Sequence, residues 1–167
     1  MTTEQHLQWV SDHLNHGLVW LKTQCINDGR LSNARLDEHQ QATYDLALST
    51  SEIRCAQAYL ETARSTSDLN ETMAETFAAS MIQSTLNRLL LSPQDVGLTR
   101  AAIAAPNALE AFLDANLRAE HLAKIGADLI TVNGETQGRG LPEAQQMIAD
   151  TFHHFADDVV APLAESI

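Results

Sequence analysis

Histidine and carboxylate residues are the groups in this chain whose spacing could support metal chemistry. The chain has seven histidines. His13 and His16 lie on adjacent helical turns, and Asp150-x-x-His153 has the carboxylate–histidine spacing that one helix contributes to a di-iron site. A di-iron site needs a matching pair on a second helix, and a zinc site needs further ligands beside His13 and His16; the sequence offers neither. Structural histidines are therefore favoured, with His153 and His154 at the rim of an apolar helix face.

Signatures of nucleophilic or phosphate chemistry are also missing. The sequence contains no Gly-x-Ser-x-Gly elbow. Gly134, Gly138 and Gly140 follow no predicted strand and lack the spacing of a dinucleotide fingerprint. Arg139, between two of these glycines, could contact an anion, but a solvated linker residue is the simpler interpretation. The sequence therefore assigns no catalytic, cofactor-binding or metal-binding residue.

Composition and charge restrict the class of protein. The 167 residues are enough for one ordinary domain with a hydrophobic core. A formal charge of −12 with only 10 lysines and arginines argues against a nucleic-acid partner and against an anionic membrane surface. We expect a soluble cytoplasmic protein, with no signal peptide in the first ten residues and no apolar run long enough to span a membrane. Cys25 and Cys55 match no metal or redox spacing, so we expect free, buried thiols.

Hydrophobic periodicity predicts an all-α fold, a bundle of about five to six helices with no sheet. In the segment 33–64 the steps of four and three are the most regular, and the seam contains mostly small residues that permit close helix packing. Segments 33–64 and 68–91 are expected to form a long antiparallel hairpin. The other helices are expected at about 3–28, 93–105, 107–129 and from 142 onward. The expected seam of 33–64 is Ala42, Leu46, Ser49, Ile53, Ala56, Leu60 and Ala63.

Local signals predict where these helices begin and end. Gly29 is expected in a left-handed conformation after the first helix, and Gly17 is expected to mark close approach of a neighbouring helix. Asp68 with Glu71 has capping-box spacing, as has the pair Asn107 and Glu110. Pro93 suits the first position of a helix. The residues expected to face inward from 107–129 are Leu109, Phe112, Leu113, Ala119 and Leu122.

The C-terminal segment is the most strongly amphipathic part of the chain. Residues 130–141 contain three glycines and are expected to form a linker between a helical bundle at 1–129 and a final helix at 142–167. The apolar residues of that helix recur at steps of four and three, which places them on one face. Such a face needs a surface on which to pack. The residues of this face are Ile148, Phe152, Phe155, Val159 and Leu163.

Residues 150–165 resemble the first helix of the acyl-CoA dehydrogenase flavoprotein family. Phe155-Ala156, Val159 or Val160, Pro162 and Ala164 match, in order, the pattern R-x-F-A-x-x-x-(V/I)-x-P-x-A of that helix. The proline is the most specific match, because proline inside a helix is costly away from a kink or an end. The sequence departs from the family at His154, where an arginine is more usual. The match covers about 20 residues.

The preceding 140 or so residues are similar in arrangement to the N-terminal helical extension of the methylsuccinyl-CoA dehydrogenase branch of the family. The resemblance implies an FAD-dependent parent enzyme in which a carboxylate base removes the α-proton of an acyl-CoA and the flavin accepts a hydride. It places the catalytic glutamate and the flavin contacts outside these residues, so this chain alone is expected to bind no FAD. The implied partner is the remainder of the dehydrogenase or a second copy in a homodimer. The alternative is a stand-alone helical interaction module without enzymatic activity.

Overall fold

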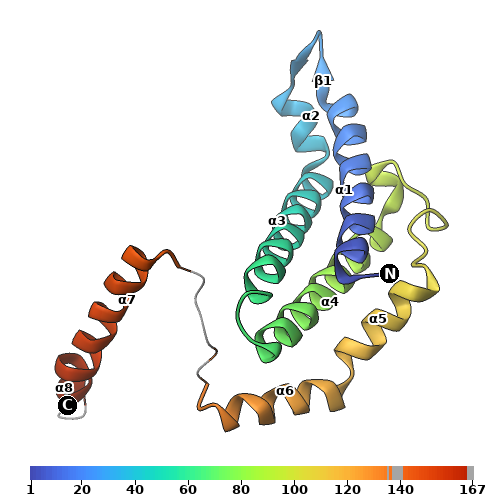
Figure 1. Ribbon diagram of the computed structural model, residues 1–167. Helices are drawn as coiled ribbons and strands as arrows, with labels where there is room; N and C mark the ends of the chain where they lie inside the picture. Colours follow the sequence, from blue (N-terminus) through green and yellow to red (C-terminus); the bar gives the residue numbers. More distant parts are fainter. Residues whose placement is uncertain (135, 137–140, 165–167) are drawn as a thin grey trace.

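The computed structural model describes residues 1–134, 136 and 141–164, and these are overwhelmingly helical (Figure 1). Helices α3 and α4 form the predicted antiparallel hairpin, α1 packs along both, and α5 packs against α4. The predicted all-α bundle is confirmed. The principal helices are α1 (Thr3–Cys25), α3 (Gln40–Ala63), α4 (Asp68–Leu91), α5 (Asn107–Leu117), α6 (Ala119–Thr131) and α7 (Glu143–Phe155).

The interface between α3 and α4 is built from small residues. The buried residues of α3 are the seven that the spacing predicts, from Ala42 to Ala63. Opposite them, α4 buries Ala74, Ala78 and Ala79 completely. Short side chains bring the two helix axes close together, and Ile53 and Ile82 then fill the remaining space. For α4 the apolar spacing predicts an inward face of Phe77, Ala78, Met81, Ile82, Leu86 and Leu89. Of these, Phe77 and Met81 are only partly buried.

Helix α1 covers one side of this hairpin. Apolar residues at steps of three and four predict a buried face on this helix, and all of them except Leu18 are buried: Leu7, Val10, Leu14, Leu21 and Cys25. Leu18, predicted on the same face, is 38% exposed, so that prediction was wrong. The face passes instead through Gly17, where an added Cβ would lie 3.0 Å from Leu46 Cδ2. The close approach predicted at Gly17 is therefore confirmed.

A small hairpin replaces the predicted end of the first helix. Helix α1 ends at Cys25, and β1 (Ile26–Asn27) pairs antiparallel with β2 (Arg30–Leu31). Each strand has only two residues, too few for a period-two alternation to be visible in the sequence. The two turn residues, Asp28 and Gly29, have φ of 49° and 76°, as a tight two-residue hairpin requires. The left-handed Gly29 is confirmed, whereas the helix predicted as far as Asp28 and the absence of strands were wrong.

Two helices predicted as continuous are each divided by one residue. At His39 (φ −109°, ψ 25°) the chain changes direction between α2 (Asn33–Glu38) and α3. At Arg118 (φ −67°, ψ 145°) it bends between α5 and α6. There the Arg118 Nε donates to the Asp114 carbonyl oxygen at 3.2 Å, which satisfies an acceptor left free at the end of α5. Neither division contains proline or glycine, so the periodicity gave no warning of it.

The predicted helix at 93–105 is reduced to one 3₁₀ turn, η1 (Pro93–Val96). Pro93 takes its first position, as predicted. Gly97 follows with φ 67°, and an added Cβ there would lie only 2.3 Å from the Trp20 ring. The rest of this stretch is a non-helical loop anchored by the buried Ile103. The loop, residues 97–106, lies over α1. Its contacts with α1 take the place of the hydrogen bonds that a helix would form within itself.

The predicted caps were displaced by one residue. Ser67, not Asp68, caps α4 by accepting from the Asn70 N–H, and Asp68 is the first helical residue. Helix α5 begins after Pro106 with no side-chain cap, so the capping role predicted for Asn107 was also wrong. At the start of α4 the Ser67 hydroxyl competes with the Asp68 carboxylate for the same backbone N–H groups, and the sequence spacing does not decide between the two side chains.

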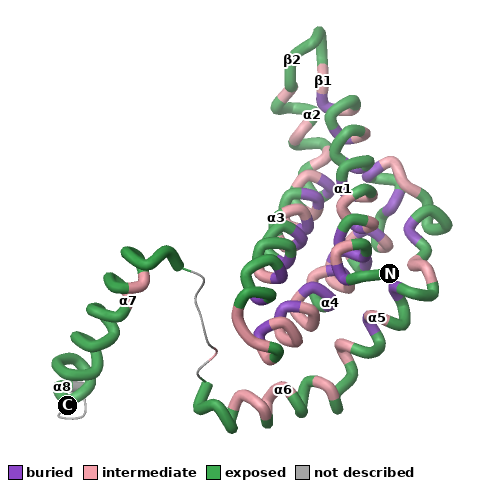
Figure 2. Tube along the Cα trace, in the orientation of Figure 1, coloured by how far each residue is buried: buried purple, intermediate pink, exposed green. Residues whose placement is uncertain are grey.

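The inward face predicted for 107–129 is confirmed only before the bend. Leu109 and Leu113 are buried and Phe112 is partly buried. Beyond Arg118, Ala119 is exposed and Leu122 is 47% exposed, contrary to prediction. Helix α5 contains the buried Leu109 and Leu113, whereas α6 has no buried residue (Figure 2). The bend turns the apolar face of α6 away from the core.

Candidate interaction surface

The histidines of α1 hold the loop 97–106 rather than a metal ion. The two ring nitrogens of His13 lie 2.8 Å from the Trp9 carbonyl oxygen and 2.9 Å from that of Ala102. His16 Nε2 lies 3.1 Å from the Gly97 carbonyl oxygen. Both residues project toward the loop because they are one turn apart. Their spacing, which could have suited a metal site, serves to fasten backbone that has no helical partner.

Two further histidines connect helices. His6 is buried and stacks on Phe112 of α5, with ring centroids 4.7 Å apart and planes at 25°. Burial, and to a smaller extent the positive N-terminus, lowers the pKa of His6, so its ring is held in the neutral form. His121 Nε2 lies 2.8 Å from Thr76 Oγ1 and attaches α6 to α4. These contacts give the histidines structural roles in helix packing.

The carboxylate–histidine pair of α7 does not form a metal site in the structure. Asp150 Oδ1 accepts from Gln146 Nε2 at 2.7 Å, and His153 Nε2 lies 3.4 Å from Asp157 Oδ2 on an exposed surface. Among the described residues, no three or more His, Cys, Asp or Glu side chains are grouped closely enough to hold a metal ion. Both His153 and His154 are exposed beside the apolar face, where the sequence predicted them.

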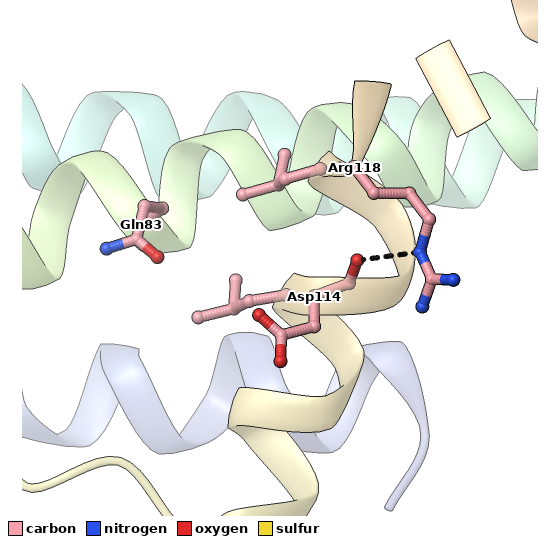
Figure 3. Close-up of a pocket in the computed structure, with 5 residues that line it drawn as sticks. Gln83, Asp114 and Arg118 are labelled. Carbon is pink, nitrogen blue, oxygen red and sulfur yellow. Dashed lines mark hydrogen bonds between the residues drawn. The ribbon is translucent and has the colours of Figure 1, made fainter. Parts of the chain in front are cut away.

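An open groove of about 550 Å³ lies where α5 bends into α6 against α4 (Figure 3). Leu113 and Leu117 line it, with Gln83 from α4 and the polar ends of Asp114 and Arg118. In Figure 3 the Arg118 side chain folds back onto the Asp114 backbone. None of these five side chains is a serine, cysteine or histidine that could act as nucleophile or base on a bound molecule. The groove is a consequence of the bend.

A bidentate ion pair connects α3 with α4. The Arg88 guanidinium bonds both carboxylate oxygens of Glu52, at 2.5 and 2.9 Å, and its Nη1 donates to Ser49 Oγ at 3.2 Å. The hydrogen bond that Arg88 donates to Glu52 is the main reason that the pKa of Arg88 is raised. Since both side chains are about 80% covered, the pair orients the hairpin and leaves no free charge for a ligand.

The thiols and the glycine linker carry no site among the described residues. Cys25 and Cys55 are both free, as predicted, but Cys55 is exposed on α3 and not buried. Gly134 has φ 73° at the end of α6. Arg139, interpreted from the sequence as a solvated linker residue, and the neighbouring Gly138 and Gly140 lie outside the described residues. Within the described chain, no helix is long and apolar enough to cross a membrane.

The largest exposed apolar surface lies on α7 and the π-helical turn η2 (Ala156–Val160). Of the described residues 141–163, none is buried (Figure 2). Single exposed apolar residues are normal, but several in register on one helix face mark an interaction surface. We call the following four residues the α7 stripe: Ile148, Phe152, Phe155 and Val159, with exposures of 59%, 70%, 56% and 43%.

A π-helical turn lies at the C-terminal end of the stripe, just before Pro162. In η2 the Ala161 N–H bonds to the Ala156 carbonyl oxygen, five residues earlier. Pro162 follows directly; it has no N–H to donate, and its ring would crowd the Asp158 carbonyl oxygen in an α-helix. The wider turn relieves that crowding. Pro162 was the only signal in the sequence for this feature.

The bundle itself is closed without the α7 stripe. The buried core is formed by residues between Leu7 and Leu113, and Leu117 is the last residue packed against it. In sequence comparisons the chain matches no protein-family model, and no curated protein gives a significant match. The functional assignment therefore depends on the geometry and the sequence of residues 143–164.

Proposed function

We propose that this chain is the non-catalytic N-terminal part of an FAD-dependent acyl-CoA dehydrogenase of the methylsuccinyl-CoA dehydrogenase type. The observation that carries the proposal is the exposed α7 stripe followed by the π-helical turn and Pro162. Of the matched positions of the family pattern, Phe155 belongs to the stripe, Val159 or Val160 lies in the π-helical turn, and Pro162 follows that turn. In the proposal, the stripe packs on the remainder of the dehydrogenase and the bundle 1–129 serves packing, dimerisation or shaping of the acyl pocket.

The chemistry of the proposed enzyme is located elsewhere. FAD accepts the hydride from the β-carbon of the acyl-CoA after a carboxylate base removes the α-proton. No residue of this chain is assigned to either step. The described side chains are compatible with that division, because no serine, cysteine or histidine lines the groove at the α5–α6 bend and the buried His6 stacks on Phe112. The proposed compartment is the cytoplasm.

Co-expression with a dehydrogenase core tests the proposal. The core is an FAD-dependent enzyme of the methylsuccinyl-CoA type from which its own N-terminal extension and first helix are removed. We expect soluble, yellow core only when this chain is co-expressed, because the α7 stripe supplies the missing packing face. A Phe155→Asp, Val159→Asp chain is the matched control and should give no recovery. Equal recovery with both chains, no recovery with either, or stoichiometric FAD on this chain alone would refute the proposal.

A stand-alone helical interaction module is the second candidate. One observation favours it: the core from Leu7 to Leu113 closes without residues 143–164. In that case the α7 stripe binds a partner unrelated to dehydrogenases, and the chain forms a stable complex in the absence of any flavoprotein. Gel filtration of the chain with and without the dehydrogenase core distinguishes the two candidates.

A further inference from the structure

The ring of His13 lies between two hydrogen-bond acceptors. Its Nδ1 is 2.8 Å from the carbonyl oxygen of Trp9, and its Nε2 is 2.9 Å from that of Ala102. A neutral imidazole has a hydrogen on only one of its nitrogens, and the other nitrogen is an acceptor. In the neutral ring one lone pair would therefore point at a carbonyl oxygen, whereas the protonated ring donates to both oxygens. The two contacts favour the charged form of His13.

The ring of Trp9 supplies a second, independent reason. The ring centroids of Trp9 and His13 are 4.2 Å apart, with the planes at 43°. A cation within about 6 Å of the centroid of a tryptophan ring is attracted to its π electrons. His16, one turn further along α1, differs because its Nε2 contacts a single carbonyl oxygen, that of Gly97, which a neutral ring can satisfy. Of these two histidines, only His13 needs a second proton for its contacts.

We infer that His13 is a pH-sensitive switch whose protonated ring fastens the loop 97–106 to α1 and whose deprotonation loosens it. The protonated ring makes both hydrogen bonds and the neutral ring makes one. The fastening is therefore complete on the acid side of the histidine titration and is weakened as the pH rises through the range of about 5 to 8. The switch is independent of the proposed function, because it involves neither the α7 stripe nor a dehydrogenase core.

The proton on His13 is held by carbonyl oxygens and a tryptophan ring, since no carboxylate forms an ion pair with His13 in the described part of the chain. Other titratable or charged residues occur within one turn of His13 on α1, in η1, in the loop and in the first turn of α5. Acidic members of this set favour a positive charge in the region, and basic members oppose it. The set is Asp12, His16, Asp95, Arg100 and Glu110.

Loosening of the loop 97–106 would uncover part of the bundle core. Ile103 is only 1% exposed, and Leu98 is partly buried against the core. The Ile103 N–H donates to the Thr99 carbonyl oxygen at 3.2 Å, so its exchange with deuterium reports opening of the loop. The amide of Ile53, which is buried in α3, reports unfolding of the whole bundle.

Two NMR measurements on the full chain test the inference. A long-range ¹H–¹⁵N spectrum should show a hydrogen on both ring nitrogens of His13 at about pH 6 and on one at about pH 8. Over the same range, and with the same midpoint, the protection of the Ile103 amide should fall roughly threefold to tenfold while that of Ile53 does not. His13→Gln has one donor group that does not titrate, so it should abolish this pH dependence. The matched control His16→Gln should retain it.

Each of four results would overturn the inference. The first is a neutral His13 at about pH 6 in a chain whose Ile103 amide is protected. The second is protection of Ile103 that does not follow the titration of His13. The third is an equal fall at Ile53, which would show that the whole bundle loosens. The fourth is loss of the pH dependence in His16→Gln and not in His13→Gln. The first three need no variant, so they decide the question even if a substituted chain does not fold.

Discussion

Replacement of Gly97 by alanine tests how the loop 97–106 is held, and its cost follows from two features of the structure. Gly97 has φ 67°, and a side chain in this left-handed region costs about 1–2 kcal/mol. The added Cβ would also lie 2.3 Å from Cγ and Cδ1 of Trp20 and 2.9 Å from its Cβ. Overpacking of this kind typically costs about 1–3 kcal/mol. We therefore expect Gly97→Ala to lower the free energy of unfolding by about 2–5 kcal/mol.

Urea unfolding followed by far-UV circular dichroism measures this loss, and two other glycines serve as controls. Gly29 has φ 76° with nothing within 4 Å of an added Cβ, so Gly29→Ala should show only the conformational cost of about 1–2 kcal/mol. Gly126 also has open space, and it lies inside α6. Gly126→Ala should therefore stabilise the chain, by up to about 1 kcal/mol.

The comparison of Gly97→Ala with Gly29→Ala shows whether the contact with Trp20 adds to the cost of the left-handed conformation. If Gly97→Ala loses no more stability than Gly29→Ala, the contact with Trp20 contributes nothing and the loop is held in another way. A larger loss should be accompanied by a change in tryptophan fluorescence of the folded state, because the ring of Trp20 must move. Absence of that change in a destabilised variant would also contradict the proposed steric cause.

Three further predictions concern the bundle. The pKa of His6 is lowered in the folded state. The stability that the neutral ring contributes is therefore complete above the unfolded pKa of 6.5 and is lost as the pH falls from 6.5 toward the folded pKa. His6→Phe should flatten this part of a plot of urea midpoint against pH. Arg88→Met and Glu52→Gln should each lower the free energy of unfolding by about 1–3 kcal/mol. A double-mutant cycle of the two substitutions should show a coupling energy, and additive losses would show that the ion pair contributes none. Ser67→Ala should lower the free energy of unfolding by about 1 kcal/mol, and by more than Asp68→Ala does. A larger loss for Asp68→Ala would show that Asp68 is the capping residue.

The parts of the fold that were predictable depend on regular repetition. The spacing of small and medium residues in α3 identified its whole buried face, because a helix that lies on a core over six turns must repeat its apolar positions. Gly17 was also correctly associated with close packing. Glycine weakens a helix, so a glycine within an otherwise strong helix indicates that a neighbour leaves no room for a side chain there.

The breaks in the helices were not predictable in the same way. The periodicity of 107–129 continues through Arg118, yet the bend there leaves Leu122 exposed. The segment after Pro93 has helix-forming residues as far as Ala105, but Gly97 against Trp20 and the bonds from His13 and His16 hold it as a loop. In each case contacts distant in sequence outweigh local propensity, which amounts to less than 1 kcal/mol per residue.

The α7 stripe also has features that are local to the sequence and others that depend on the tertiary structure. The sequence by itself determined the α7 stripe and the unusual position of Pro162, because amphipathic spacing and the missing N–H of proline are local properties. Only the tertiary structure decided that the core from Leu7 to Leu113 is complete without this stripe and leaves it exposed. Which apolar face a bundle uses depends on how the volumes of all its helices fit together, and no single helix contains that information.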